Sequence, residues 1–297
     1  MPAIAGIIFI IGFIIVSMSL PKLPAPAALS SFKFSHPAPT RSAYDDLKKI
    51  NAASAVVVET KSSLNLLNYK SDELRSIASL TKLMTVLVFL DHNPGWNKEV
   101  IIEKNDLRSG AKANIFAGDK LSVKDLFSLS LVASDNSAIA TLVRISGLSE
   151  EDFVKAMNTK AKDLSLGGLS FTDPTGLDPE NKGTARAVAK LFSEALSKKE
   201  IAQSLATPDL EFKVSPNLKR RAFSTNQLLG RELPKGTLLV GGKTGHLDEA
   251  GYCFAGAFKF KNKEIITVVL GANLDNERFS ETLKILDWTI QAYIWEN

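Results

Sequence analysis

Strand-like segments lie toward both ends of this 297-residue chain, and helix-like segments lie between them. Short runs rich in Val, Leu, Ile and Phe that are bounded by turn residues are typical of buried strands. The strands at either end of the chain cannot bury their apolar side chains alone, so the strands of the two ends must pair with each other. The sequence therefore predicts one α+β domain, in which an antiparallel sheet of about five strands forms from both chain ends and a helical subdomain is inserted. The expected strands cover residues 52–60, 64–69, 237–240, 250–260 and 264–272.

The middle of the chain has apolar residues at helical spacing. Ser122 is expected to cap one helix, and the polar residues 133–137 are expected to separate that helix from the next. Asn93-Pro94-Gly95 is a strong helix breaker and should end a helix that opens at Ser79. The other expected helices cover residues 45–50, 121–132, 138–146, 151–164, 185–197 and 275–295.

The first twenty residues predict a membrane anchor or a signal segment. Residues 3–20 are apolar apart from two serines, which is long enough for a short membrane span. Ala25-Pro26-Ala27 is a candidate cleavage site, so an uncleaved anchor and a cleaved signal both stay open. Residues 21–43 are rich in Pro, Ala and Ser and are expected to form a tether. Residues 44–297 would then form the folded domain outside the cytoplasmic membrane, either tethered to it or secreted.

Composition excludes several classes of function. The net charge is +4 and basic residues are mixed with acidic ones, so no nucleic-acid partner is implied. The single cysteine, Cys253, excludes an internal disulfide and lies in an apolar stretch typical of a core position. Three histidines and one cysteine leave little for a metal site. We therefore expect a protein without a metal or other cofactor.

Ser79 and Lys82 form a candidate nucleophile and base. A serine and a lysine three residues apart share one face of a helix. The helix N-terminus and burial would both lower the pKa of the lysine, so that a neutral amine could take the serine proton. Alone, the spacing would equally fit a helix-start serine followed by a solvated lysine. The same spacing recurs at residues 19–22, 30–33 and 109–112, but only at Ser79 does it open an apolar helix.

Two further polar clusters follow Ser79 in the chain. They are Ser134-Asp135-Asn136, between two expected helices, and Lys243-Thr244-Gly245, on an expected strand. The three clusters in this order resemble those of class A β-lactamases and penicillin-binding proteins. Residues 171–177, 226–230 and 242–253 extend the resemblance to the low-molecular-mass penicillin-binding proteins, which are D-alanyl-D-alanine carboxypeptidases of the serine peptidase class. It covers the chain from about residue 52 to the C-terminus.

The resemblance implies a catalytic mechanism. Ser79 would attack the carbonyl between two D-alanines of a peptidoglycan stem peptide, form an acyl-enzyme and expel the terminal D-alanine. Lys82 would act as the base for this attack. Ser134 would relay a proton from Lys82 to the leaving amine, and Lys243 would help to keep Lys82 neutral by like-charge repulsion. The stem peptide is the implied substrate, and β-lactam antibiotics are the implied covalent inhibitors.

The resemblance also implies substrate-binding residues. Lys243 and Thr244 would bind the terminal carboxylate of the substrate, since a cation beside a hydroxyl suits that group. Asn136 carries both a donor and an acceptor and would contact either a peptide backbone or Lys82. The backbone N–H groups of Ser79 and His246 would form the oxyanion hole, and Gly245 would let the substrate backbone approach closely.

Other chemistries fit less well. A Ser-His-Asp triad could use only His246, and there is no Gly-x-Ser-x-Gly motif. Residues 236–244 have the wrong spacing for a phosphate-binding loop. A β-lactamase would need a deacylating glutamate, for which residues 171–178 offer only aspartates. An endopeptidase that cuts peptidoglycan cross-links shares every motif, and the expected end of the chain after one helix resembles the endopeptidase-like members. A surface protein that binds β-lactams without turnover also stays open.

Overall fold

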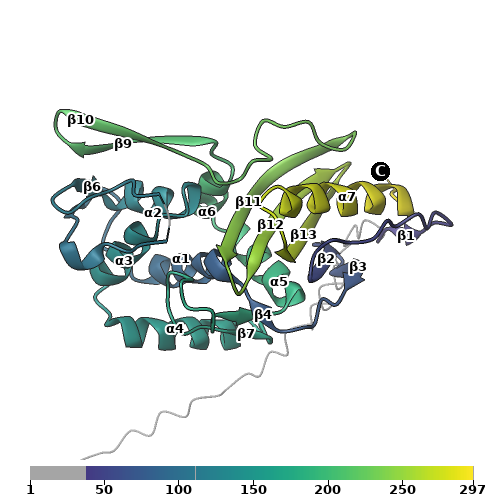
Figure 1. The fold of residues 1–297 in the computed structure, drawn as a ribbon, viewed down its shortest axis with the longest axis horizontal. Coiled ribbons are helices and arrows are strands. Elements are labelled where there is room, and N and C mark those ends of the chain that lie inside the picture. Colours follow the sequence, from purple (N-terminus) through teal and green to yellow (C-terminus); the bar gives the residue numbers. More distant parts are fainter. Residues whose placement is uncertain (1–37, 111, 297) are drawn as a thin grey trace, which may run out of the picture. The chain divides into compact units, whose positions relative to one another are not determined.

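The computed structural model describes residues 38–110 and 112–296. Its centre is a five-stranded antiparallel sheet with the order β11-β12-β13-β2-β3 (Figure 1). The pairing of β13 with β2, in which Val268 lies opposite Val56, joins the two chain ends as predicted. The strands are β2 (Ser54–Glu59), β3 (Leu64–Tyr69), β11 (Thr237–Leu247), β12 (Gly251–Phe260) and β13 (Lys263–Ala272).

Both faces of this sheet are buried, because neighbouring residues along its strands belong to different core clusters. Val57 and Phe254 pack with apolar residues of the C-terminal helix α7 (Glu277–Ala292). Val56 and Ala255, one residue away on the same strands, pack on the helical part of the chain. Successive side chains of a strand point to opposite faces, so these apolar strands separate two layers of helices. Figure 1 shows α7 on one face of the sheet and α5 on the other.

Helix α1 (Lys82–Asp91) runs through the larger core cluster, with eight of its ten residues buried. The short 3-10 helix η1 (Ala78–Thr81), which contains Ser79, leads directly into it. The predicted cap of the next helix is confirmed, because the Ser122 hydroxyl accepts a hydrogen bond from the Asp125 N–H. The remaining helices are α2 (Val123–Val132), α3 (Asn136–Ile145), α4 (Glu150–Asp163), α5 (Ala185–Leu196), α6 (Lys199–Leu205) and the 3-10 helix η2 (Lys104–Asp106).

Four small sheets complete the fold. One is the hairpin of β9 (Asp209–Ser215) and β10 (Leu218–Phe223). The sequence analysis did not predict it, although β9 alternates between apolar and polar residues and a Pro-Asn turn follows it. The others are β1 (Thr40–Arg41) with β14 (Tyr293–Ile294), β5 (Glu99–Ile101) with β6 (Lys120–Ser122), and β4 (Arg75–Ser76) with β8 (Lys182–Gly183) and β7 (Leu169–Ser170).

The N-terminal part of the described chain differs from the sequence prediction in two ways. The helix predicted at residues 45–50 is wrong, since this segment has no regular structure. A six-residue segment is too short to form a helix without packing support. It lies against α7 instead, where Lys284 Nζ donates to the Lys49 carbonyl oxygen at 2.5 Å and Ile50 packs among the apolar residues of the helix. Strand β1 also shows that regular pairing begins at Thr40, before the expected boundary at residue 44.

The predicted anchor at residues 1–20 and most of the predicted tether lie outside the described residues. Within residues 38–110 and 112–296, no helix has the length and apolar character needed to cross a membrane.

Candidate active site

Ser79 lies in a tight turn that is enclosed from two sides. The residue before it, Ala78, has a left-handed backbone with φ of +45°. Gly176 packs so closely on this turn that a Cβ atom there would collide with the Ala78 carbonyl oxygen. On the other side, a Cβ atom at Gly245 of β11 would lie 3.0 Å from the Ile77 carbonyl oxygen and 3.2 Å from the Ser79 nitrogen. The loop around Gly176 and strand β11 therefore hold the turn in place, and both need glycine to do so.

Lys82 is fully buried, and its amine contacts Ser79. The Nζ atom donates to Ser79 Oγ at 2.8 Å, to Asn136 Oδ1 at 2.7 Å and to the Thr175 carbonyl oxygen at 2.6 Å. Burial lowers the pKa of Lys82 to about 7, although the charges of two nearby aspartates oppose the shift. A neutral amine has two N–H groups and one lone pair. Since the Asn136 and Thr175 oxygens can only accept, the lone pair of the neutral amine would face the Ser79 hydroxyl.

Ser134 contacts a second buried lysine. Lys243 Nζ donates to Ser134 Oγ at 2.6 Å and to the Thr244 carbonyl oxygen at 3.0 Å. Burial lowers the pKa of Lys243 well below its usual value, and the positive charges of Lys82 and Arg278 lower it further. Ser134 has a left-handed backbone with φ of +57°, although it is not glycine. Because Ser134 accepts from Lys243, its own hydroxyl proton is free to point elsewhere. The predicted relay from Lys82 through Ser134 stays a prediction.

Asn136 begins helix α3, and both ends of its amide are engaged. Its oxygen accepts from Lys82, and its Nδ2 group donates to the Ser109 carbonyl oxygen at 3.0 Å. Of the two partners predicted for Asn136, the structure therefore places Lys82 in contact. The preceding Asp135 caps the helix by accepting from the Ala138 N–H, which explains why an acidic residue stands between Ser134 and Asn136.

Strand β11 forms the edge of the sheet beside the Ser79 turn. The Thr244 and Thr225 hydroxyls share a hydrogen bond of 2.6 Å. The exposed His246 ring stacks on Tyr252 with 4.0 Å between the ring centroids. Its backbone belongs to β11, the strand whose Gly245 packs against the Ser79 turn. The expectation that the His246 backbone, more than its imidazole, serves the site stays a prediction.

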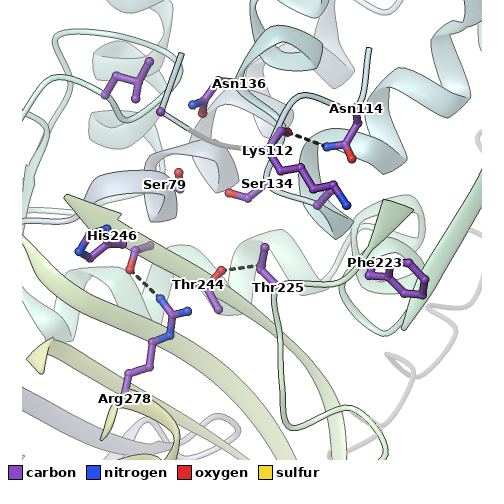
Figure 2. Close-up of a pocket in the computed structure, with 14 residues that line it drawn as sticks. Ser79, Lys112, Asn114, Ser134, Asn136, Phe223, Thr225, Thr244, His246 and Arg278 are labelled. Atoms are coloured by element: carbon purple, nitrogen blue, oxygen red, sulfur yellow. Dashed lines mark hydrogen bonds between the residues drawn. The ribbon is translucent and has the colours of Figure 1, made fainter. Parts of the chain in front are cut away.

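The predicted residues surround one pocket of about 330 Å³ (Figure 2). Lys82 and Lys243 do not line it, but each contacts a serine that does. The six predicted residues that line it are Ser79, Ser134, Asn136, Thr244, Gly245 and His246. No cluster of ligands that could hold a metal ion occurs in the part of the chain that the structure describes.

Arg278 also lines the pocket and was missed by the sequence analysis. It belongs to α7, the helix that follows the last strand of the central sheet, and only 7% of its surface is exposed. Its Nη1 group donates to the Gly245 carbonyl oxygen at 3.1 Å. No local pattern distinguishes this arginine from others on an amphipathic helix, because its role depends on how α7 packs against the sheet.

The motifs and the geometry match those of known proteins. Residues 39–274 match the model of the peptidase S11 family, which is described as D-alanyl-D-alanine carboxypeptidase. The chain belongs to the S11 peptidase family. Among S11 relatives, it is 32% identical over 251 residues to a D-alanyl-D-alanine carboxypeptidase from Bacillus subtilis, which covers 82% of this chain and 63% of the relative. It is 30% identical over 243 residues to a D-alanyl-D-alanine endopeptidase from Escherichia coli, which covers 81% of this chain and 77% of the relative.

A solved structure confirms the fold. The ampicillin-bound form of penicillin-binding protein D2 from Listeria monocytogenes superposes with a TM-score of 0.69 and 31% sequence identity. The match covers 82% of this chain and 98% of that one. The S11 chain described here therefore has the penicillin-binding-protein fold that the sequence predicted.

Proposed function

We propose that this S11 chain is a serine D-alanyl-D-alanine carboxypeptidase that removes the terminal D-alanine from peptidoglycan stem peptides. One observation carries the proposal: a fully buried lysine amine with a pKa of about 7 lies 2.8 Å from the Ser79 hydroxyl. Near neutral pH such an amine is available as a base without a histidine.

Acylation would proceed in two steps. As Ser79 Oγ bonds to the carbonyl carbon of the penultimate D-alanine, its proton passes to the neutral Lys82 amine. The carbon–nitrogen bond then breaks, and the leaving amine takes the proton from Lys82 through the Ser134 hydroxyl, which returns Lys82 to its neutral form. This leaves an ester between Ser79 and the stem peptide, while D-alanine departs with a neutral amino group. Water would hydrolyse the ester and restore Ser79.

The charges around the pocket suit a carboxylate at the end of the substrate. Lys243 is buried beneath Thr244, and Arg278 approaches from the other side of β11. A cation and a hydroxyl together bind a carboxylate through charge-assisted hydrogen bonds. The N–H groups of Ser79 and His246 would hold the oxyanion. A β-lactam, which also carries a carboxylate, would acylate Ser79 by the same steps and inhibit the enzyme.

Cleavage of cross-links is a second candidate activity, because a relative of similar identity is named an endopeptidase. Both reactions would use the same nucleophile and base. A further proposal concerns location: the apolar residues 3–20 would place the enzyme outside the cytoplasmic membrane, tethered to it or secreted after cleavage.

The test is product analysis with the full-length chain. We expect D-alanine release from a free pentapeptide that ends in D-Ala-D-Ala, and its loss in Ser79→Ala. The control is Ser193→Ala, which changes a half-buried serine on α5 and should retain activity. If only cross-linked dimers are cut and the pentapeptide persists, the endopeptidase activity is correct. If neither substrate reacts but penicillin still labels Ser79, the chain is a β-lactam-binding protein without peptidase turnover.

A further inference from the structure

One motif of the sequence has no part in the reaction proposed above. Residues 226–230 lie in the segment between β10 and β11, and Gln227 of this segment contacts Asp275, two residues before α7. Thr225 at one end of it bonds to Thr244. The segment is anchored by Leu228, which is 1% exposed and packs in the core under α7. The Asn226 side chain also accepts from the Leu228 N–H at 3.0 Å. The segment therefore presents Gln227 at a defined position.

A chain of hydrogen bonds leads from Gln227 to the pocket. Gln227 Nε2 donates to Asp275 Oδ2 at 2.9 Å. The other carboxylate oxygen of Asp275 accepts from Arg278 Nη2. The Nη1 group of the same arginine donates to the Gly245 carbonyl oxygen. Arg231 Nη2 donates to Gln227 Oε1 at 3.0 Å. With a donor on one side and an acceptor on the other, only one orientation of the Gln227 amide satisfies both partners.

Arg278 needs such a partner because little else directs its guanidinium. Its charged group lies 4.9 Å from the Phe279 ring centroid and 5.4 Å from that of Tyr252. Its Nε atom is buried and has no protein partner. Asp275 orients the guanidinium, but 49% of the Asp275 side chain is exposed. Without Gln227, that carboxylate could turn toward solvent and release Arg278.

We propose that Gln227 is a positioning residue that acts through Asp275 on Arg278, and that it controls how tightly the pocket holds the carboxylate end of a substrate. The inference rests on the proposed function, because it assigns Arg278 to the carboxylate. Gln227 itself does not line the pocket. It should therefore affect substrate affinity and leave the chemical step on Ser79 unchanged.

The experiment compares Gln227→Met with Gln291→Met. Gln291 is a matched control, since its Nε2 group also donates to an aspartate, Asp287, at 2.8 Å on the exposed surface of α7. We expect Gln227→Met to raise KM for a peptide ending in D-Ala-D-Ala by about five-fold, the usual net effect of losing one hydrogen bond. The value of kcat and the melting temperature should stay those of the wild type. Gln291→Met should change none of these.

A double-mutant cycle tests the route through Asp275. In an Asp275→Ala background, Gln227→Met should cause no further rise in KM, because its partner is already absent. An unchanged KM in the single variant, an undiminished effect in the Asp275→Ala background, or a joint fall of kcat and melting temperature would overturn the inference.

The two proposals fail in different ways. If the wild type releases no D-alanine, the proposed carboxypeptidase activity is wrong. The wild type and Gln227→Met are then compared by the rate at which benzylpenicillin, also a carboxylate, acylates each chain. A five-fold slower acylation of Gln227→Met, absent in the Asp275→Ala background, would still support the positioning role. Equal acylation rates, or no acylation of any variant, would overturn it.

Discussion

Lys82 is the residue on which the rate and pH dependence of the proposed reaction depend most. Burial lowers the pKa of its amine from 10.5 to about 7. This shift corresponds to a loss of about 5 kcal/mol in the stability of the ammonium form relative to the neutral amine. An amine with the ordinary pKa would be neutral in about one molecule in three thousand at pH 7, whereas an amine with a pKa near 7 is neutral in about half. The buried position therefore raises the population of the base by about a thousand-fold.

We predict that kcat/KM for D-alanine release rises with pH along a limb centred near 7, because the deprotonated amine is the active form. In Lys82→Arg the guanidinium stays protonated at every accessible pH. We expect this variant to lose at least about a hundred-fold in kcat/KM, and the limb to disappear. The control is Lys155→Arg, at a lysine on α4 whose side chain is 64% exposed.

The assay is the initial rate of D-alanine release from a peptide ending in D-Ala-D-Ala, measured between about pH 5 and pH 9. A rate that shows no midpoint near pH 7 and is still rising steeply at about pH 9 would show that the pKa of Lys82 stays close to its ordinary value. Lys82→Arg with activity near that of the wild type would show that the amine is not the base. Either result would refute the role assigned to burial.

Three further predictions concern the same site. Gly176→Ala should lower the free energy of unfolding by more than about 2 kcal/mol and slow acylation by penicillin, because the new methyl group meets the Ala78 carbonyl. The control is Gly147→Ala, at a glycine with the same left-handed backbone but open space around it. It should lower the free energy of unfolding in urea by less and be acylated at the normal rate. Asn136→Ala removes an acceptor that favours the ammonium form of Lys82, so the limb of the pH profile should move to lower pH while kcat falls at least about ten-fold. Lys82→Met should raise the free energy of unfolding by about 1–3 kcal/mol at pH 7. Since the folded-state pKa of Lys82 lies below the unfolded one, the wild type should gain stability from about pH 7 to pH 10.5, and urea unfolding of the variant should show a weaker gain.

Much of the fold was predictable, because the strands are apolar on both faces and bounded by turns. The pairing of β2 with β13 follows from the need of both chain ends to bury apolar residues. The helix predicted at residues 45–50 was wrong because tertiary contacts with α7 determine that segment. The β9–β10 hairpin was overlooked although β9 alternates and a Pro-Asn turn follows it, because the three consecutive basic residues of β10 hide the pattern of a strand.

The candidate site was predictable to the extent that its residues occur in motifs. Ser79 and Lys82 come together through local helix geometry, and the resemblance named the partners on α3 and β11. The carbonyl of Thr175 and the guanidinium of Arg278 were not predictable. A backbone carbonyl leaves no signature in a sequence, and Arg278 reaches the pocket only through the packing of α7 against the sheet.

The most direct test of the central claim is the mass of the chain after reaction with benzylpenicillin, followed by peptide mapping. We predict one covalent adduct on the peptide that contains Ser79, formed faster above pH 7 than below it, and no adduct in Ser79→Ala. An adduct that persists in Ser79→Ala, or that maps to another residue in the wild type, would contradict the assignment of Ser79 as the nucleophile.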